Sequence, residues 1–138
     1  MDDAAFGVFS GPVRTEWLPD GRGMQVLCAL EFREPSGREW HVPAGALIDG
    51  ASIPRLFWSG LGGPYEGLYR DASVVHDYEC CVRERPWPDV HRMFWHAMRA
   101  RGESKWRADL MYYAVRHFGP RWPGATALAA PDEDHVQR

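Results

Sequence analysis

Proline and glycine residues punctuate this sequence so that short apolar runs come first and longer, helix-spaced runs come later. The early runs cover residues 12–18, 24–32 and 38–43, and the turn formers Pro19-Asp20-Gly21 and Pro35-Ser36-Gly37 separate them. Proline fixes φ and glycine tolerates positive φ, which tight turns between strands require. The N-terminal part is therefore predicted to be a small antiparallel β-meander.

The second half of the sequence has the periodicity of helices. The predicted helices cover residues 54–60, 68–83, 89–102 and 104–119. Ser104 is a suitable N-cap for the last of them, and Gly119 followed by proline is a strong stop signal. The predicted fold class is α+β, with the small N-terminal meander followed by three to four helices.

Length and composition indicate one globular domain. The chain has 138 residues, of which 45% are hydrophobic, and domains commonly hold about 100 to 150 residues. Residues 1–122 are predicted to form a single domain, and residues 123–138, rich in alanine, proline and acids, a flexible or partner-bound tail. No specific nucleic-acid motif, signal peptide or run of roughly 20 apolar residues is found, so no transmembrane segment is expected.

The cysteines do not suggest a disulfide framework. Cys28, Cys80 and Cys81 are odd in number, two of them are adjacent, and no C-x-x-C spacing occurs. Reduced thiols are therefore expected, and a zinc site built from thiolates alone is not.

A histidine–aspartate pair on the predicted helix 68–83 is the main candidate for chemistry. His76 supplies a proton acceptor near neutral pH and Asp77 supplies a hard oxygen ligand, two parts that hydrolytic sites often place together. The segment Asp49-Gly50-Ala51-Ser52-Ile53-Pro54 precedes that helix as an ordered connection. We expect Asp49 to meet the helix at one end of the domain, with His76 and Asp77 protruding into a water-filled hollow.

A structural interpretation of the same residues stays open. His76 then donates to a carbonyl between helix and sheet, and Asp77 pairs with Arg55 or Arg70. Asp49, which precedes a glycine, is also a good acceptor for nearby backbone N–H groups.

A series of short motifs resembles a known protein family. The motifs are Val42-Pro43-Ala44-Gly45, Asp49 to Pro54, His76-Asp77-Tyr78, Arg92-Met93-Phe94 and Trp106-Arg107-Ala108. They are similar to those of phage and prophage proteins that share a domain of unknown function, over about residues 40 to 119. The resemblance implies a phage or prophage origin and a place in the host cytoplasm or the virion. It makes phage structural proteins candidate partners, and Ser52, Tyr78 and Arg92 candidate binding residues.

The His-Asp pair also resembles that of phospholipases A2. In those enzymes the histidine activates water, the adjacent aspartate binds calcium, and carbonyls of a glycine-rich loop complete the metal shell. The resemblance implies that His76 is the base and Asp77 the Ca²⁺ ligand, with Gly60, Gly62 and Gly63 in the loop. Phospholipids and phosphoesters are the implied substrates.

The sequence departs from the lipase pattern at one position. The lipases carry an aspartate on the second helix that orients the histidine, and this chain has His91 there. Aspartate and histidine are both common ligands of transition metals. Asp49, His76, Asp77 and His91 are therefore a second candidate set, for Zn²⁺ or Mn²⁺ or Fe²⁺, resembling a His-Asp phosphohydrolase site.

Two functions follow as expectations. The first is a hydrolase-like protein with a metal-assisted site, in which His76 and His91 are the catalytic pair. The second is a non-enzymatic virion protein, for a tail or for assembly, that keeps the same scaffold and uses its tryptophans for contacts. The sequence leaves open whether the chain is an enzyme and whether it needs any cofactor.

Overall fold

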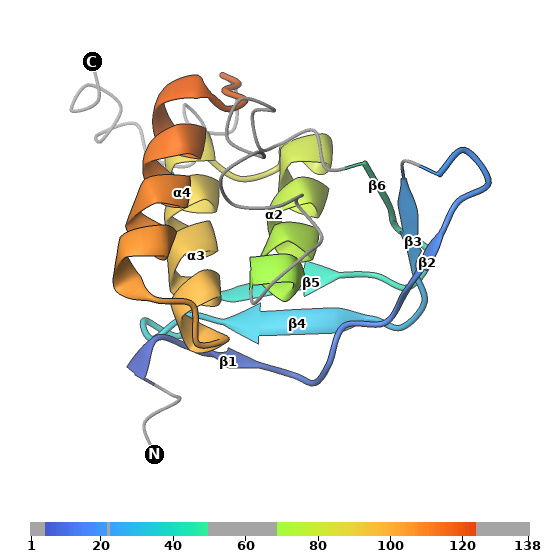
Figure 1. Cartoon of the computed structure of the whole chain (residues 1–138), viewed down its shortest axis with the longest axis horizontal. Helices are drawn as coiled ribbons and strands as arrows, with labels where there is room; N and C mark the ends of the chain where they lie inside the picture. The colour runs from blue at the N-terminus through green and yellow to red at the C-terminus, as the bar shows by residue number, and fades with distance from the viewer. Residues whose placement is uncertain (1–4, 22, 50–68, 124–138) are drawn as a thin grey trace.

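The computed structural model describes residues 5–21, 23–49 and 69–123. This part of the chain holds the strands β1 (Val8–Phe9), β2 (Thr15–Trp17), β3 (Met24–Val26), β4 (Leu30–Arg33), β5 (Glu39–Val42) and β6 (Leu47–Ile48), followed by the helices α2 (Arg70–Val82), α3 (Trp87–Ala100) and α4 (Lys105–Phe118). Strands precede helices (Figure 1), which confirms the predicted α+β fold class. The predicted helix at 54–60 lies outside the described residues, as does the predicted tail from residue 124 on.

The strands form two small antiparallel sheets, of order β1-β4-β5 and β2-β3-β6, where one meander was predicted. The predicted strand 24–32 is in fact two strands, because the chain leaves one sheet after Val26 and enters the other at Leu30. Val26 pairs with the chain before β6, since its N–H donates to the Ala46 carbonyl and its own carbonyl accepts from Gly45. The strands β1 and β6 were missed because each has only two residues, too few for a detectable alternation.

Alternation of side chains gives the sheet β1-β4-β5 one buried face. Leu30 and Phe32 on β4 are buried, and so are Trp40 and Val42 on β5. The register pairs Leu30 with Val42 and Phe32 with Trp40, so all four lie on one face. The helix α2 contacts β5 and β6, and α3 contacts β1. Figure 1 shows the helices standing on one side of this sheet.

The three helices pack in sequence order, α2 against α3 and α3 against α4. The predicted apolar face of α3 is confirmed, because Val90, Met93, Phe94, Ala97 and Met98 are all fully buried. None of the described helices has the length and apolar character needed to cross a membrane.

The helix boundaries follow local signals. The helix α3 begins at Trp87, two residues before the predicted start, because Pro86 occupies the N-cap and Pro88 fits the first turn. A proline there removes an N–H that has no partner within the helix anyway. Ser104 takes the predicted N-cap position of α4, without a capping hydrogen bond from its side chain.

Trp40 joins the sheet to the connection between α2 and α3. Its side chain is fully buried, and its indole N–H donates to the Glu34 carboxylate at 2.6 Å. The guanidinium carbon of Arg85 lies 3.9 Å from the centroid of the Trp40 ring, a cation–π contact from the α2–α3 connection. Trp40 therefore contributes apolar area, a buried hydrogen bond and a cation–π contact at one point.

Replacing Trp40 by alanine is expected to lower the free energy of unfolding by about 3 to 5 kcal/mol, as for other large aromatic side chains in cores. Chemical denaturation at neutral pH measures the change. The matched control is Trp106→Ala, since Trp106 is 63% exposed and its loss is expected to cost less than about 0.5 kcal/mol. Equal losses for the two variants would contradict the assignment of Trp40 to the core.

Candidate functional site

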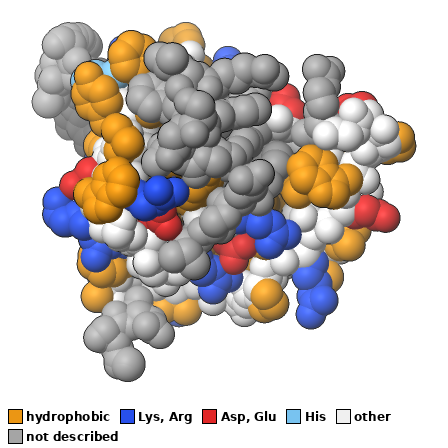
Figure 2. Space-filling model, viewed as in Figure 1, with side chains coloured by type: hydrophobic (Ala, Val, Ile, Leu, Met, Phe, Trp, Pro, Cys, Tyr) orange, Lys and Arg blue, Asp and Glu red, His pale blue; other side chains and the backbone are white. Residues whose placement is uncertain are grey.

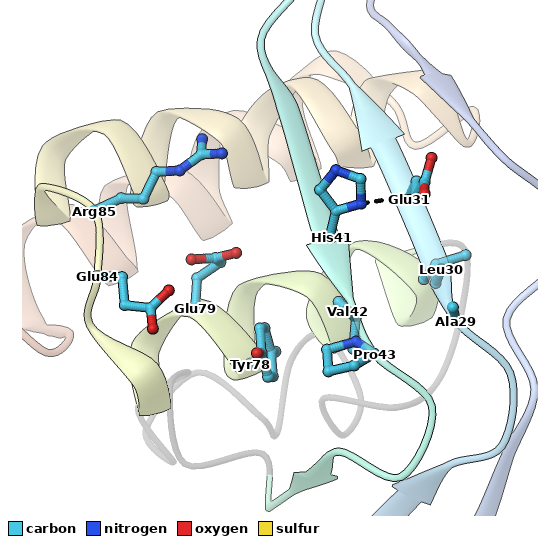
Figure 3. Close-up of a pocket in the computed structure, with 10 residues that line it drawn as sticks. All are labelled: Ala29, Leu30, Glu31, His41, Val42, Pro43, Tyr78, Glu79, Glu84 and Arg85. Carbon is cyan, nitrogen blue, oxygen red and sulfur yellow. Dashed lines mark ion pairs between the residues drawn. The ribbon is translucent and has the colours of Figure 1, made fainter.

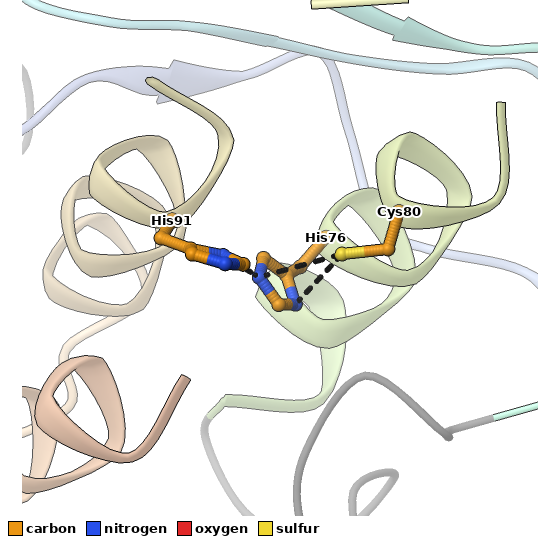
Figure 4. Close-up of side chains that lie close together, drawn as sticks. All are labelled: His76, Cys80 and His91. Atoms are coloured by element: carbon orange, nitrogen blue, oxygen red, sulfur yellow. Dashed lines mark hydrogen bonds between the residues drawn. The ribbon is translucent and has the colours of Figure 1, made fainter. Parts of the chain in front are cut away.

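A pair of buried histidines joins α2 to α3. The Nε2 atom of His76 lies 2.9 Å from the Nδ1 atom of His91, and both side chains are fully buried. The Nε2 atom of His91 lies 2.9 Å from the carbonyl oxygen of Pro120. Figure 4 shows the two imidazole rings reaching toward each other from the two helices. The structure therefore brings together the two residues that were predicted from the sequence to be the catalytic pair.

The Pro120 carbonyl determines the tautomers of both rings. A carbonyl oxygen only accepts, so His91 carries its proton on Nε2 and donates it to Pro120. A neutral His91 then has a lone pair on Nδ1, and the short contact requires His76 to donate from Nε2. A neutral His76 with its proton on Nε2 has its remaining lone pair on Nδ1.

Burial keeps both imidazoles neutral near neutral pH. It lowers the pKa of His76 well below the usual 6.5, and the neighbouring His91 lowers it further. Burial also lowers the pKa of His91 to about 4, although the bond to Pro120 opposes this shift, while Arg116 and Arg121 add to it. Two neutral rings are what the assigned hydrogen-bond directions require.

Aromatic rings enclose the histidine pair. The ring of His76 stacks on Phe94, with centroids 4.3 Å apart and an interplanar angle of 23°. The ring of His91 lies 5.7 Å from Trp87 and 6.3 Å from Trp122, measured between centroids. These contacts fix the orientation of each imidazole in a largely apolar setting.

Cys80 belongs to the same cluster. Its Sγ atom lies 3.8 Å from Nε2 and 4.0 Å from Nδ1 of His76. Burial raises the pKa of the Cys80 thiol far above its usual value, and Asp77 raises it further, so without a metal the group is a thiol. Sequence reasoning missed Cys80, although a spacing of four residues from His76 places both on one helix face.

The three side chains could hold a metal ion. Potential ligand atoms of His76, Cys80 and His91 all lie within 4.8 Å of one another. Two imidazole nitrogens and a thiolate suit Zn²⁺ and related ions, whereas Ca²⁺ prefers oxygen. The bond from His91 to Pro120 is of the kind that orients a histidine ligand through its second nitrogen.

Asp49 and Asp77 are not among the side chains of this cluster. Asp77 is buried and Asp49 is exposed. Burial raises the pKa of the Cys81 thiol, and the charges of Asp49 and Asp77 raise it further. The strand β6, which ends one residue before Asp49, contacts α2, and a site shared by Asp49 and Asp77 stays a prediction.

The prediction that His76 and Asp77 protrude into a water-filled hollow is wrong, because both side chains are buried. His76 is fully buried and Asp77 is 1% exposed, because the interface of α2 with α3 covers the histidine. Arg70, a predicted structural partner of Asp77, contacts Asp71 at 3.8 Å and donates to the Thr15 hydroxyl at 3.2 Å. Arg55, the other predicted partner, lies outside the described residues.

The remaining predicted site residues have separate places. Tyr78 lines a cavity beside β5, and burial raises the pKa of its phenol, with Glu79 and Glu84 adding to the shift. Arg92 is exposed and pairs with Asp89 at 2.7 Å on α3 itself. Ser52, Gly60, Gly62 and Gly63 lie outside the described residues.

The neutral histidines predict a stability that falls with acid. Unfolded histidine binds a proton near pH 6.5, so between that pH and the lowered folded pKa the unfolded chain binds more protons than the folded chain. With a folded pKa of about 4, His91 contributes about 3 kcal/mol of stability that is present above pH 6.5 and lost as the pH falls toward 4. Denaturant titrations of the metal-free protein across this range measure the loss.

A His91→Asn variant is expected to lose less stability than wild type as the pH falls. The matched control is His117→Asn, at an exposed position, which should keep the wild-type dependence on pH. A wild-type protein that is equally stable at about pH 5 and about pH 7 would contradict the neutral, buried pair.

Comparison with known proteins gives a family without an assigned activity. Residues 24–115 match the family described as "Protein of unknown function (DUF1353)". The chain is 47% identical over 119 residues to the uncharacterized protein y4jT of Sinorhizobium fredii (strain NBRC 101917 / NGR234), covering 85% of this chain and 35% of that protein. It is 42% identical over 115 residues to the uncharacterized protein y4iH of the same organism, covering 83% of this chain and 48% of that protein.

The chain thus spans between about a third and a half of the length of these relatives. No solved structure matches. Because the family match covers about two thirds of the chain and includes every strand from β3 to β6, all of α2 and α3 and most of α4, this protein belongs to the DUF1353 family.

Proposed function

We propose that this protein is a hydrolase-like domain in which His76 is the base and His91 is the residue that positions it. The observation that carries the proposal is the chain of two 2.9 Å contacts from His76 through His91 to the Pro120 carbonyl. Such a chain fixes the ring and the tautomer of a histidine that must accept a proton. His91 supplies the acceptor that an aspartate supplies in the lipase pattern.

The proposed reaction is hydrolysis of an ester. Water reaches His76 in the working state and gives a proton to Nδ1, while its oxygen attacks the ester carbon or phosphorus. The imidazolium of His76 then keeps its hydrogen bond to the Nδ1 atom of His91. The proton that Nδ1 of His76 accepted from water then passes to the leaving oxygen as the ester bond breaks.

His91 differs from a carboxylate in one respect that matters for rate. It orients His76 but carries no negative charge, so it does not stabilise the imidazolium as an aspartate would. The proposed base is accordingly weak, and it stays unprotonated at mildly acidic pH.

Several finer parts of the proposal are supported by the sequence resemblance alone. They are calcium held by Asp77 with the loop of Gly60, Gly62 and Gly63, a phospholipid or phosphoester substrate, and a phage or prophage origin with a place in the host cytoplasm or virion. The alternative in which Asp49 joins His76, Asp77 and His91 as a ligand of Zn²⁺ or Mn²⁺ is likewise supported by the sequence alone.

A hydrolysis screen tests the base. Purified wild type is offered phospholipids and phosphoesters with Ca²⁺, Mn²⁺ or Zn²⁺ present. We expect turnover by wild type and a loss of at least about 100-fold in His76→Ala, the usual scale for a general base. His91→Asp is expected to keep or raise the rate and to move the acid limb of the pH profile upward, because a carboxylate raises the pKa of His76.

His117→Ala, at an exposed position, is the matched control and should retain the wild-type rate. Equal rates for wild type and His76→Ala would remove the base from the mechanism. A folded wild type without turnover on any substrate would support a non-enzymatic role instead.

A metal centre is a second candidate for the same side chains, and the position of Cys80 favours it. Zinc bound by His76, Cys80 and His91 would stand where the proton between the two rings now lies. Tetrahedral zinc, with Zn–N of about 2.0 to 2.1 Å, separates two nitrogens by about 3.3 Å, against the 2.9 Å between the rings here. A small widening of the α2–α3 interface would therefore suffice, and a fourth position would remain for water.

Metal analysis separates the two candidates. If the centre exists, purified wild type holds about one zinc per chain, Cys80→Ser loses most of it, and Co²⁺ replacing zinc shows the absorption of a thiolate ligand. The matched control is Cys28→Ser, because Cys28 is an exposed free cysteine. Equal metal content in wild type and Cys80→Ser would leave the hydrogen-bonded pair as the better description.

The structure also offers an observation in favour of the non-enzymatic alternative. The helix α4 carries exposed apolar side chains at helical spacing, namely Trp106, Leu110 and Tyr113, and the exposed ring of Phe118 contacts that of Tyr113, with centroids 6.2 Å apart. Figure 2 shows hydrophobic side chains on the side of the molecule where α4 lies. Exposed apolar side chains that gather on one helix are typical of surfaces that contact another protein, which suits a tail or assembly component.

A further inference from the structure

A cavity lies between the β4–β5 hairpin and the C-terminal half of α2. Its volume is about 440 Å³, within the range of about 300 to 1,000 Å³ found for small-molecule sites. The residues that line it are Ala29, Leu30, Glu31, His41, Val42, Pro43, Tyr78, Glu79, Glu84 and Arg85. Figure 3 shows side chains from the hairpin and from α2 around it. None of the three residues of the His76 cluster lines this cavity.

Glu79 is the unusual member of this lining. Its side chain is 5% exposed, yet no hydrogen bond or ion pair joins its carboxyl group to any described residue. The other buried glutamates of the described chain do have partners. Glu34 accepts from Trp40 at 2.6 Å, and Glu103 accepts from Arg107 at 2.5 Å. The Glu79 carboxyl therefore has no partner among the described residues where it lines the cavity, and a ligand in the cavity can supply one.

Arg85 does not fill that role, because other contacts hold it. Its Nη2 atom donates to the Glu39 carbonyl, and its guanidinium lies over the Trp40 ring at 3.9 Å. The ion pairs of the described residues include none between Arg85 and Glu79. Arg85 is thus held against β5 and makes no ion pair with Glu79, although its own Nη1 atom is buried without a hydrogen-bond partner among the described residues.

The other charged groups around the cavity leave it with an excess of carboxylate. Glu31 is paired with His41 at 3.1 Å, whereas Glu79 and Glu84 both lie at the α2 side. Burial raises the pKa of Glu79 to about 7, Arg85 opposes the shift, Glu84 adds to it and His41 opposes it. The field of these groups therefore favours a positive charge next to Glu79.

The remaining wall is apolar. Leu30, Val42 and Pro43 face the cavity from the hairpin, and Tyr78 adds an aromatic ring from α2. Such a wall suits an alkyl stem and an aromatic face suits an organic cation. The lining therefore places carbon surface beside the carboxylates of Glu79 and Glu84.

We propose that this cavity binds a small organic cation, an ammonium or guanidinium group on a short alkyl stem, with the Glu79 carboxylate as its counter-ion. The stem lies against Leu30, Val42 and the Tyr78 ring. Glu84 adds a second negative charge at the same side. This proposal is independent of the proposed hydrolase function, since it uses none of the residues assigned to that chemistry.

The ammonium group could belong to a free amine or to a lysine side chain. A calorimetric titration distinguishes these two sources, at about pH 8, where Glu79 is largely ionised. The probes are n-butylamine, spermidine and acetyl-lysine amide, with butyrate as the anionic control. We expect the wild-type chain to bind the amines and not butyrate. Tighter binding of acetyl-lysine amide than of spermidine identifies a protein side chain, and the reverse order identifies a polyamine.

Glu79→Gln is the decisive variant. It keeps the size of the side chain and removes an unpaired buried charge, so its melting temperature should equal or exceed that of wild type. Its affinity for the amines should fall at least about tenfold, while Glu16→Gln, at an exposed position, should keep the wild-type affinity. Equal amine binding by wild type and Glu79→Gln would overturn the proposal. So would binding of butyrate as tight as that of butylamine, or no binding of any amine up to about 10 mM.

Discussion

The hydrogen-bonded contact between α2 and α3 is the constraint on which the rest of the helical layer depends. Two imidazoles are buried there at a distance of 2.9 Å, and each polar nitrogen in such a place needs a partner. The chain of donors ends on the Pro120 carbonyl, which follows α4. One short series of hydrogen bonds therefore ties the registers of α2 and α3 to the chain that leaves α4. A charge on either ring would upset this arrangement, because the assigned hydrogen-bond directions require two neutral imidazoles.

Much of the fold was predictable because its signals are local. Alternating burial on β4 and β5 follows directly from the order of their residues, and the buried face of α3 follows from its helical spacing. The division into two sheets was not predictable in the same way. It depends on backbone hydrogen bonds from Val26 to Gly45 and Ala46, nearly twenty residues later in the chain. The residue pattern within β3 does not indicate these distant partners.

The candidate site shows the same limit. Comparison with the lipase pattern placed His91 where an orienting residue belongs, and the structure brings its Nδ1 atom to His76. Which nitrogen carries each proton depends on Pro120, 29 residues further along the chain, and on burial that no single residue reveals. The role of Cys80 did have a local signal, since it lies four residues from His76 on the same helix, but the resemblance to phospholipases A2 implies Asp77 as the ligand instead.

Two neighbouring buried side chains of α2, His76 and Glu79, differ in whether they have a hydrogen-bond partner among the described residues, and this difference bears on function. His76 and His91 satisfy each other, so any chemistry there must first open a stable contact or exchange its shared proton for a metal ion. Glu79, three residues further along, is buried to a lesser degree, has no such partner, and lies at a cavity of about 440 Å³. A satisfied pair gains little from a ligand, whereas a carboxyl without an ion pair gains a counter-ion. Of these two parts of α2, the cavity at Glu79 therefore has more to gain from binding another molecule.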